Sequence, residues 1–115
     1  MAEFHKLGSV DEVGPGNIKQ YVLEDRFVAL CNVEGEFHAF EDVCTHAFAY
    51  LSEGGMEGDR IKCPLHGALF DVRTGQPKSL PAVKPVPKHE VKVEDGNVYV
   101  AMNPKRVKVR TRRRV

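Results

Sequence analysis

Two short pairs of cysteine and histidine constrain this chain more than any other feature. Cys44 and His46 form the first pair, Cys63 and His66 form the second, and residues 47–62 separate them. Each pair is followed by small or glycine residues instead of a helix-forming stretch. Thiolates and imidazoles are metal ligands, so the pattern predicts one metal site held by two facing loops.

Two kinds of metal centre accept this ligand set. A structural zinc ion binds two cysteines and two histidines in a tetrahedron. A [2Fe–2S] cluster can also be held by two cysteines on one iron and two histidines on the other. The spacing of the four residues leaves both open, and residues outside the pairs decide between them.

The rest of the chain predicts an all-β fold. Short segments rich in valine, phenylalanine and tyrosine alternate with turn signals, and no stretch of a dozen residues keeps a helical period. The Asp95-Gly96 pair is a strong hairpin signal. We expect strands at 17–23, 26–33, 36–41, 89–94 and 97–101, with Val91, Val93, Val98 and Val100 facing the core.

Residues 43–87 differ from these strands, because they are rich in glycine and proline and contain both ligand pairs. We expect a loop-built subdomain inserted into a β scaffold. The predicted organisation is therefore one domain over residues 1–104, with the subdomain at about 43–87, and a basic tail over residues 105–115.

Composition narrows the setting. The 115 residues suit a single domain. No run approaches the roughly 18 apolar residues of a membrane span, and the start has no apolar signal segment, so we expect a cytoplasmic protein without membrane contact. The third cysteine, Cys31, lies in an apolar stretch and is predicted to be a buried, inert thiol, which argues against a disulfide framework.

The charge is unevenly distributed. Residues 105–115 hold seven of the 17 basic residues and no acid, so residues 1–104, with 10 basic and 16 acidic residues, carry a net charge of −6. The tail fits a β-strand, a solvated arm, or an arm that docks on an acidic partner or neighbouring subunit. Nucleic acid is not an expected partner, because the acidic body would repel phosphate.

Residues beyond the four ligands favour iron over zinc. The stretch 63–71, followed by Thr74-Gly75 and Leu80-Pro81-Ala82, strongly resembles the Rieske ferredoxin family. Residues 51–54, after the first pair, carry the same resemblance. It extends from about Leu7 to Met102, nearly all of the chain before the tail.

The resemblance implies a Rieske antiparallel β-sandwich, like that of the iron–sulfur proteins of cytochrome complexes, with an inserted loop-rich cluster-binding subdomain. It implies one [2Fe–2S] cluster per chain, bound by Cys44, His46, Cys63 and His66. It further implies a soluble carrier, without catalytic activity of its own, that passes single electrons from a flavin-dependent reductase to the terminal oxygenase of a bacterial aromatic-ring-hydroxylating dioxygenase. Pro81 would lie in a loop covering the cluster, and the edges of the two histidines would be the electron port.

Departures from high-potential relatives predict a low potential. Ala49 and Leu65 stand where those proteins have a disulfide, and Ala68 and Phe70 stand where they have a serine and a tyrosine that donate hydrogen bonds. Fewer donors favour the oxidised, less negative cluster, so we expect a potential near about −150 mV. We also expect the potential to fall as pH rises past the pKa of the bound histidines.

Two other functions remain open, namely the small subunit of an assimilatory nitrite reductase and a zinc-stabilised interaction module. The spare histidines, His5, His38 and His89, are expected to be structural. Asp71 and Thr74 are expected to form a turn. Neither the oligomeric state nor the aromatic substrate is indicated by the sequence.

Overall fold

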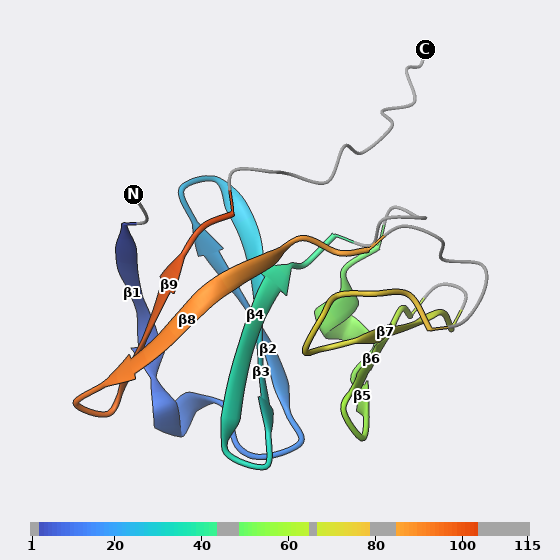
Figure 1. The fold of residues 1–115 in the computed structure, drawn as a ribbon, viewed down its shortest axis with the longest axis horizontal. Helices are drawn as coiled ribbons and strands as arrows, with labels where there is room; N and C mark the ends of the chain where they lie inside the picture. Colours follow the sequence, from blue (N-terminus) through green and yellow to red (C-terminus); the bar gives the residue numbers. More distant parts are fainter. Residues whose placement is uncertain (1–2, 44–48, 65–66, 79–84, 104–115) are drawn as a thin grey trace.

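The computed structural model describes residues 3–43, 49–64, 67–78 and 85–103. Across these residues the regular structure consists of β-strands and two short 3₁₀ helices, so the all-β prediction is confirmed (Figure 1). All strand pairs are antiparallel. In the part of the chain described, no helix is long and apolar enough to cross a membrane.

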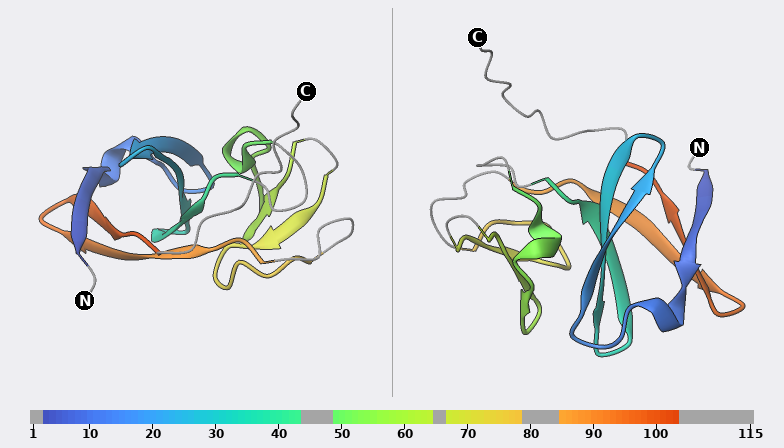
Figure 2. Two further views of the ribbon diagram at one scale, coloured as in Figure 1. Left: turned by 90° about the horizontal axis from the view of Figure 1, so that it is seen from above. Right: turned by 180° about the vertical axis from the view of Figure 1, so that it is seen from behind.

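Six strands form the larger sheet, in the order β1-β9-β8-β4-β3-β2. The sheet curls on itself into an open barrel, seen end-on in Figure 2, left. Its strands are β1 (Phe4–Ser9), β2 (Ile18–Leu23), β3 (Arg26–Val33), β4 (Glu36–Glu41), β8 (Lys88–Glu94) and β9 (Asn97–Ala101), with the 3₁₀ helix η1 (Val10–Glu12) after β1.

A smaller sheet packs beside the barrel. It contains β5 (Met56–Glu57), β6 (Arg60–Lys62) and β7 (Leu69–Asp71), and it follows the 3₁₀ helix η2 (Leu51–Glu53). We call η2 and these three strands the three-stranded unit. The region expected to be a loop-built subdomain also contains these three short strands, which were not expected because strands with few apolar positions leave little period-2 signal.

Three two-residue turns connect the barrel hairpins β2–β3, β3–β4 and β8–β9. Both residues of each turn have positive φ, as a type I′ turn requires. The hairpin predictions are confirmed at these turns, which are Glu24-Asp25, Glu34-Gly35 and Asp95-Gly96.

Two barrel features differ from the prediction. The strand β1 was not expected, since Gly8 interrupts it where its register against β9 shifts. Val93 is 52% exposed instead of buried, whereas Val98 and Val100 are in the core as expected. Val93 is two residues before the β8–β9 turn, which projects from the end of the barrel (Figure 1).

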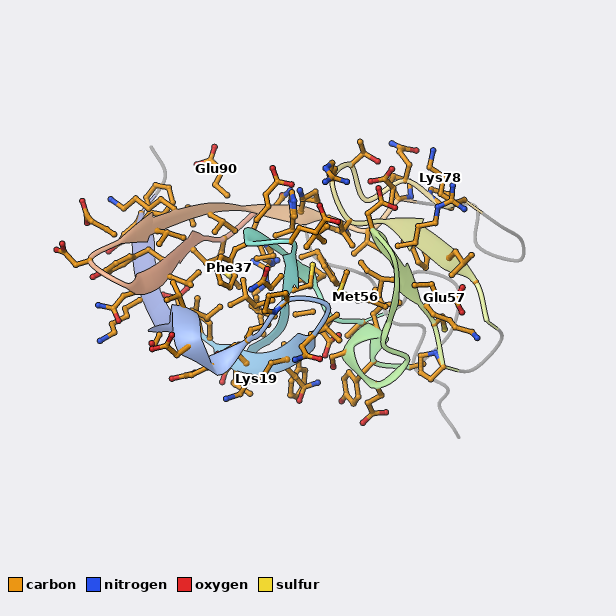
Figure 3. All side chains as sticks on the ribbon, turned by 90° about the horizontal axis from the view of Figure 1, so that it is seen from below. Lys19, Phe37, Met56, Glu57, Lys78 and Glu90 are labelled. Carbon is orange, nitrogen blue, oxygen red and sulfur yellow. The ribbon has the colours of Figure 1, made fainter. Side chains whose placement is uncertain are left out.

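Two apolar cores lie on opposite faces of β3 and β4. One fills the barrel and includes Val28, Leu30 and Val98. The other joins the barrel to the three-stranded unit, with Phe40 from β4 and Phe70 from β7 among its members. Figure 3 shows Met56 at this junction, and Phe37 between the two layers of the barrel.

Cys31 belongs to the second core and is fully buried. Burial raises the pKa of its thiol to about 12, so it stays protonated and unreactive at neutral pH. The prediction of a buried, inert thiol is confirmed.

Candidate metal centre

Of the four predicted ligands, the structure describes Cys63, while Cys44, His46 and His66 lie outside the described residues. Cys63 is fully buried and is a free thiol. It opens the turn that joins β6 to β7. Its N–H donates to the Ala68 carbonyl at 2.8 Å, and Gly67 N–H donates to the Cys63 carbonyl at 2.9 Å. The positive φ of Gly67 (+74°) makes this tight turn accessible.

Asp42 fixes the entrance and exit of the segment that carries the first ligand pair. Its carboxylate accepts hydrogen bonds from the Ser52 backbone N–H at 2.7 Å and the Ser52 hydroxyl at 2.6 Å. The Gln20 amide donates to the same carboxylate at 2.7 Å. Its carbonyl also accepts from Leu51 N–H at 2.7 Å. Asp42 therefore joins the two ends of the segment to each other and to β2.

Asp42 is fully buried, and this burial raises the pKa of its carboxyl above the usual range although the bonds from Ser52 and Gln20 act in the opposite direction. A buried acid is kept in a core when its hydrogen bonds are satisfied. The sequence reasoning missed this residue. The sequence feature that could have identified Asp42 is an acid at the end of a predicted strand, two positions before a predicted ligand.

Gly54 brings the two ligand regions together. A Cβ atom at this position would lie 1.7 Å from the Lys62 carbonyl oxygen and 2.9 Å from Pro64 N. The chain that follows the first pair therefore contacts the backbone on both sides of Cys63. Only glycine permits this approach.

Close packing is the reason for glycine at this position. Positive φ occurs instead at the next residue, Gly55 (+77°). Gly54 has φ −90°, an ordinary value, so close packing instead of backbone conformation requires it.

Two further hydrogen bonds fix the backbone on either side of segment 79–84, which contains the predicted covering loop. Lys78 N–H donates to the Leu69 carbonyl at 2.7 Å, and Val86 N–H donates to the Gly75 carbonyl at 2.8 Å. Pro81 and the rest of 79–84 lie outside the described residues. Because Leu69 also ends the turn that Cys63 opens, Lys78, the last described residue before this segment, lies beside that turn.

The surroundings of Cys63 suit a buried cluster of low potential. Cys63 shares one apolar core with Ala68 and Phe70, both fully buried. A buried thiol outside any disulfide is a competent ligand, because metal binding takes the thiolate form. Neither of these two neighbours carries a hydroxyl that could donate to sulfur. The donor chemistry and the burial at Cys63 therefore fit a [2Fe–2S] cluster.

The spare histidines have structural contacts. His89 is buried, its Nδ1 accepts from Asn103 N–H at 2.9 Å, and its Nε2 lies 3.4 Å from Glu41 Oε1. His38 lies between Glu36 and the Lys88 ammonium group. The contacts of His89 with Glu41 and of Lys88 with His38 both join β8 to β4. The third, His5, lies 3.5 Å from Glu24.

The turn prediction for Asp71 and Thr74 is also confirmed. Arg73 N–H donates to the Asp71 carboxylate at 2.8 Å, and Gln76 N–H donates to the Thr74 hydroxyl at 3.2 Å. Both residues therefore stabilise the backbone of the turn, as short polar side chains commonly do.

Comparisons with known proteins show the family of this chain. The Rieske [2Fe-2S] domain model matches residues 3–90. The biphenyl dioxygenase ferredoxin subunit of Pseudomonas sp. (strain KKS102) is 45% identical, over 84% of this chain and 90% of the relative.

Two solved structures resemble the chain over most of its length. The ferredoxin of carbazole 1,9a-dioxygenase from Nocardioides aromaticivorans IC177 has a TM-score of 0.84 at 32% identity, covering 89% of this chain and all of that one. A chain in a complex of reduced oxygenase and oxidised ferredoxin in carbazole 1,9a-dioxygenase has a TM-score of 0.80 at 42% identity, covering 85% and 92%.

This chain belongs to the Rieske [2Fe-2S] family and binds one [2Fe–2S] cluster. Within the family it is a ferredoxin of the aromatic dioxygenase type, an electron-transfer component that is not itself catalytic. A putative nitrite reductase small subunit matches with a TM-score of 0.74 at 23% identity, which shows the shared fold alone. The assignment as a nitrite reductase small subunit is therefore less supported than the assignment as a dioxygenase ferredoxin.

Proposed function

We propose that this ferredoxin takes single electrons from a flavin-dependent reductase and delivers them to the terminal oxygenase of an aromatic-ring-hydroxylating dioxygenase system. When bound, the [2Fe–2S] cluster supplies one-electron redox chemistry. The chain supplies the ligands, the water-excluding surroundings and the surfaces that partners recognise. The aromatic substrate is bound by the oxygenase, and this chain acts in the cytoplasm.

Cys44 and Cys63 would bind one iron, and His46 and His66 the other. The observation that carries this assignment is the contact of Gly54 with the backbone around Cys63, because it places the chain that follows the first pair against the second. Asp42 then holds the two ends of the first pair's segment. The division into residues 1–104, a subdomain at about 43–87 and a tail at 105–115 remains a prediction.

Charge would guide association with partners. Residues 1–104 carry a net charge of −6, which favours partner surfaces rich in lysine and arginine. Attraction of this kind is screened by salt. The rate of electron delivery is therefore expected to fall as ionic strength rises.

The test is direct electron delivery. Purified protein, reduced by dithionite without oxygen, is expected to show the rhombic electron paramagnetic resonance signal of a Rieske centre. Mixed in a stopped-flow instrument with the oxidised oxygenase of the carbazole 1,9a-dioxygenase system, or with that of the biphenyl system, it is expected to be reoxidised by at least one. A colourless protein with one zinc per chain would contradict the cluster assignment, and a reduced cluster that neither oxygenase reoxidises would contradict the electron route.

A further inference from the structure

Two exposed apolar side chains face each other across the β2–β3 hairpin. Val22 is 64% exposed and Phe27 is 36% exposed, and the two are direct partners in the strand register. Most large apolar side chains of the described residues are at least partly buried, so such a pair on a hairpin is a marked exception.

This pair extends the sheet face that packs against the three-stranded unit. Side chains alternate between faces along a strand. On β2, the residues on the Val22 face are Ile18, which packs against the core that contains Cys63, and Gln20, which bonds to Asp42. Val22 and Phe27 are on the same face, beyond the part that the three-stranded unit covers.

Phe27 connects this surface to the predicted cluster. Its ring lies 5.1 Å from the ring of Tyr50, centroid to centroid, with the planes tilted by 57°. Tyr50 is two residues after the segment 44–48, which contains the first ligand pair. The β2–β3 turn and the end of β4, which enters that segment, lie at the same end of the molecule in both figures of the ribbon (Figure 1; Figure 2, right).

The border of this surface is acidic. Glu24 and Asp25 form the turn beside Val22, and Glu53 follows Tyr50 by three residues. All three are exposed. An apolar centre of Val22, Phe27 and Tyr50 bordered by acids is complementary to an apolar side chain surrounded by lysine or arginine. We call these six residues the hairpin patch.

We propose that the hairpin patch is a docking surface for the terminal oxygenase, seated on this side of the cluster. The proposal rests on the proposed function, since an oxygenase that takes electrons at the cluster must cover the surface next to the ligand segments. A chain 42% identical to this one is known in a complex with an oxygenase. Small contacts are sufficient for transient redox complexes.

A second copy of the chain fits the patch less well. In a two-fold dimer the same patch would face itself, which would bring Glu24, Asp25 and Glu53 close to their own copies. Like charges at the rim of an interface oppose association. The three apolar side chains of the patch would also bury far less area than the roughly 1,200 Å² of a stable interface.

Val22 is the position to substitute, because its exposure makes a change harmless to the fold. The variants Val22→Lys and Val22→Glu remove the apolar contact and differ in charge. Val93→Lys and Val93→Glu are matched controls, since Val93 is a 52% exposed strand valine next to the β8–β9 turn. That turn lies at the opposite end of the barrel from the β2–β3 turn (Figure 1). Each reduced ferredoxin is mixed with oxidised carbazole or biphenyl dioxygenase oxygenase, and the second-order rate constant of reoxidation is measured.

We expect Val22→Lys to lower the rate constant about tenfold and Val22→Glu to lower it less, since a basic partner surface repels lysine and attracts glutamate. The difference between the two should narrow as salt is added. Both Val93 variants should stay within about twofold of the parent. The visible spectrum and the midpoint potential should be the same in all five proteins.

The proposal is overturned if Val22→Lys equals Val93→Lys, or if Val22→Glu is slower than Val22→Lys. It is also overturned if sedimentation finds a dimer of the parent that Val22→Lys dissociates, because the patch would then be buried between copies. Failure of the parent to reduce either oxygenase is a different result, which removes the proposed function itself before any variant is compared.

Discussion

The barrel and the three-stranded unit are stabilised by different means. In the barrel, full strand registers and apolar alternation place many side chains in one core, and no single contact decides the fold. In the three-stranded unit the strands have two or three residues each, and single contacts at Asp42, Gly54 and Gly75 hold the backbone. A given type of substitution should therefore lower stability when it is made in the barrel. In the three-stranded unit it should lower cofactor binding.

Cys31 and Cys63, the two buried cysteines among the described residues, give the sharpest version of this comparison. Cys63→Ser is expected to abolish the visible absorbance of the cluster, because a predicted ligand is removed. Cys31→Ser places a hydroxyl in the core and is expected to cost about 1–3 kcal/mol of stability while the spectrum is retained. Absorbance per mole of protein and iron content measure both. Equal absorbance in the two variants would show that Cys63 is not a ligand.

Substitution of glycine by alanine tests the close packing at Gly54. Gly54→Ala places a methyl group against the Lys62 carbonyl oxygen and should cost about 3 kcal/mol or more, with a lower fraction of cluster-loaded protein. Gly14→Ala is the control, since its nearest neighbour is the end of the Asn17 side chain at 3.3 Å. The cluster content of the Gly14 variant should match that of the parent. An unchanged Gly54 variant would mean that the two ligand regions are not brought together by this contact.

A buried ion pair of the barrel lies at the entrance of the first ligand segment. Glu41 accepts from Arg26 Nη2 at 2.7 Å, and the two side chains are 6% and 10% exposed. Burial opposes ionisation of Glu41, but His89 and Arg26 outweigh it and lower its pKa. A carboxyl with a lowered pKa adds stability above its ordinary pKa, here 4.5, and loses it as pH falls through the folded-state value.

Glu41→Gln should therefore lower the melting temperature by about 10 °C at pH 7. The difference from the parent should shrink below about pH 4.5. Glu36→Gln is the control, since Glu36 is 58% exposed and should change the melting temperature by no more than about 2 °C. A difference that stays constant from pH 7 to pH 4 would contradict the role given to the Glu41 charge.

The same contrast explains what the sequence could predict. The barrel hairpins follow from period-2 alternation and from turns such as Asp95-Gly96, both of which are local signals. The predicted ligand Cys63 came from a motif. Asp42 was missed, and the packing role of Gly54 was not anticipated, because both roles depend on partners elsewhere in the sequence, at Gln20 and Lys62. No local pattern records such a contact.

The smallest expected effect is on the redox potential. Its measurement shows whether the apolar core around Cys63 sets the value of that potential. The parent is expected near the bottom of the Rieske range, at about −150 mV. Ala68→Ser and Phe70→Tyr would each introduce a hydroxyl beside the turn that Cys63 opens. A hydrogen bond that is stronger in the reduced state by about 1 kcal/mol raises a one-electron potential by about 40 mV.

Ala39→Ser is the matched control, because Ala39 is equally buried but belongs to the barrel core. Its potential should equal that of the parent, although its stability should fall. Protein-film voltammetry measures all four proteins. If Ala39→Ser shifts the potential as much as Phe70→Tyr, the potential responds to the protein as a whole and the distinction between the two regions fails. A parent midpoint well above 0 mV would contradict the low-potential assignment, because donors outside the Ala68 and Phe70 positions would then stabilise the reduced cluster.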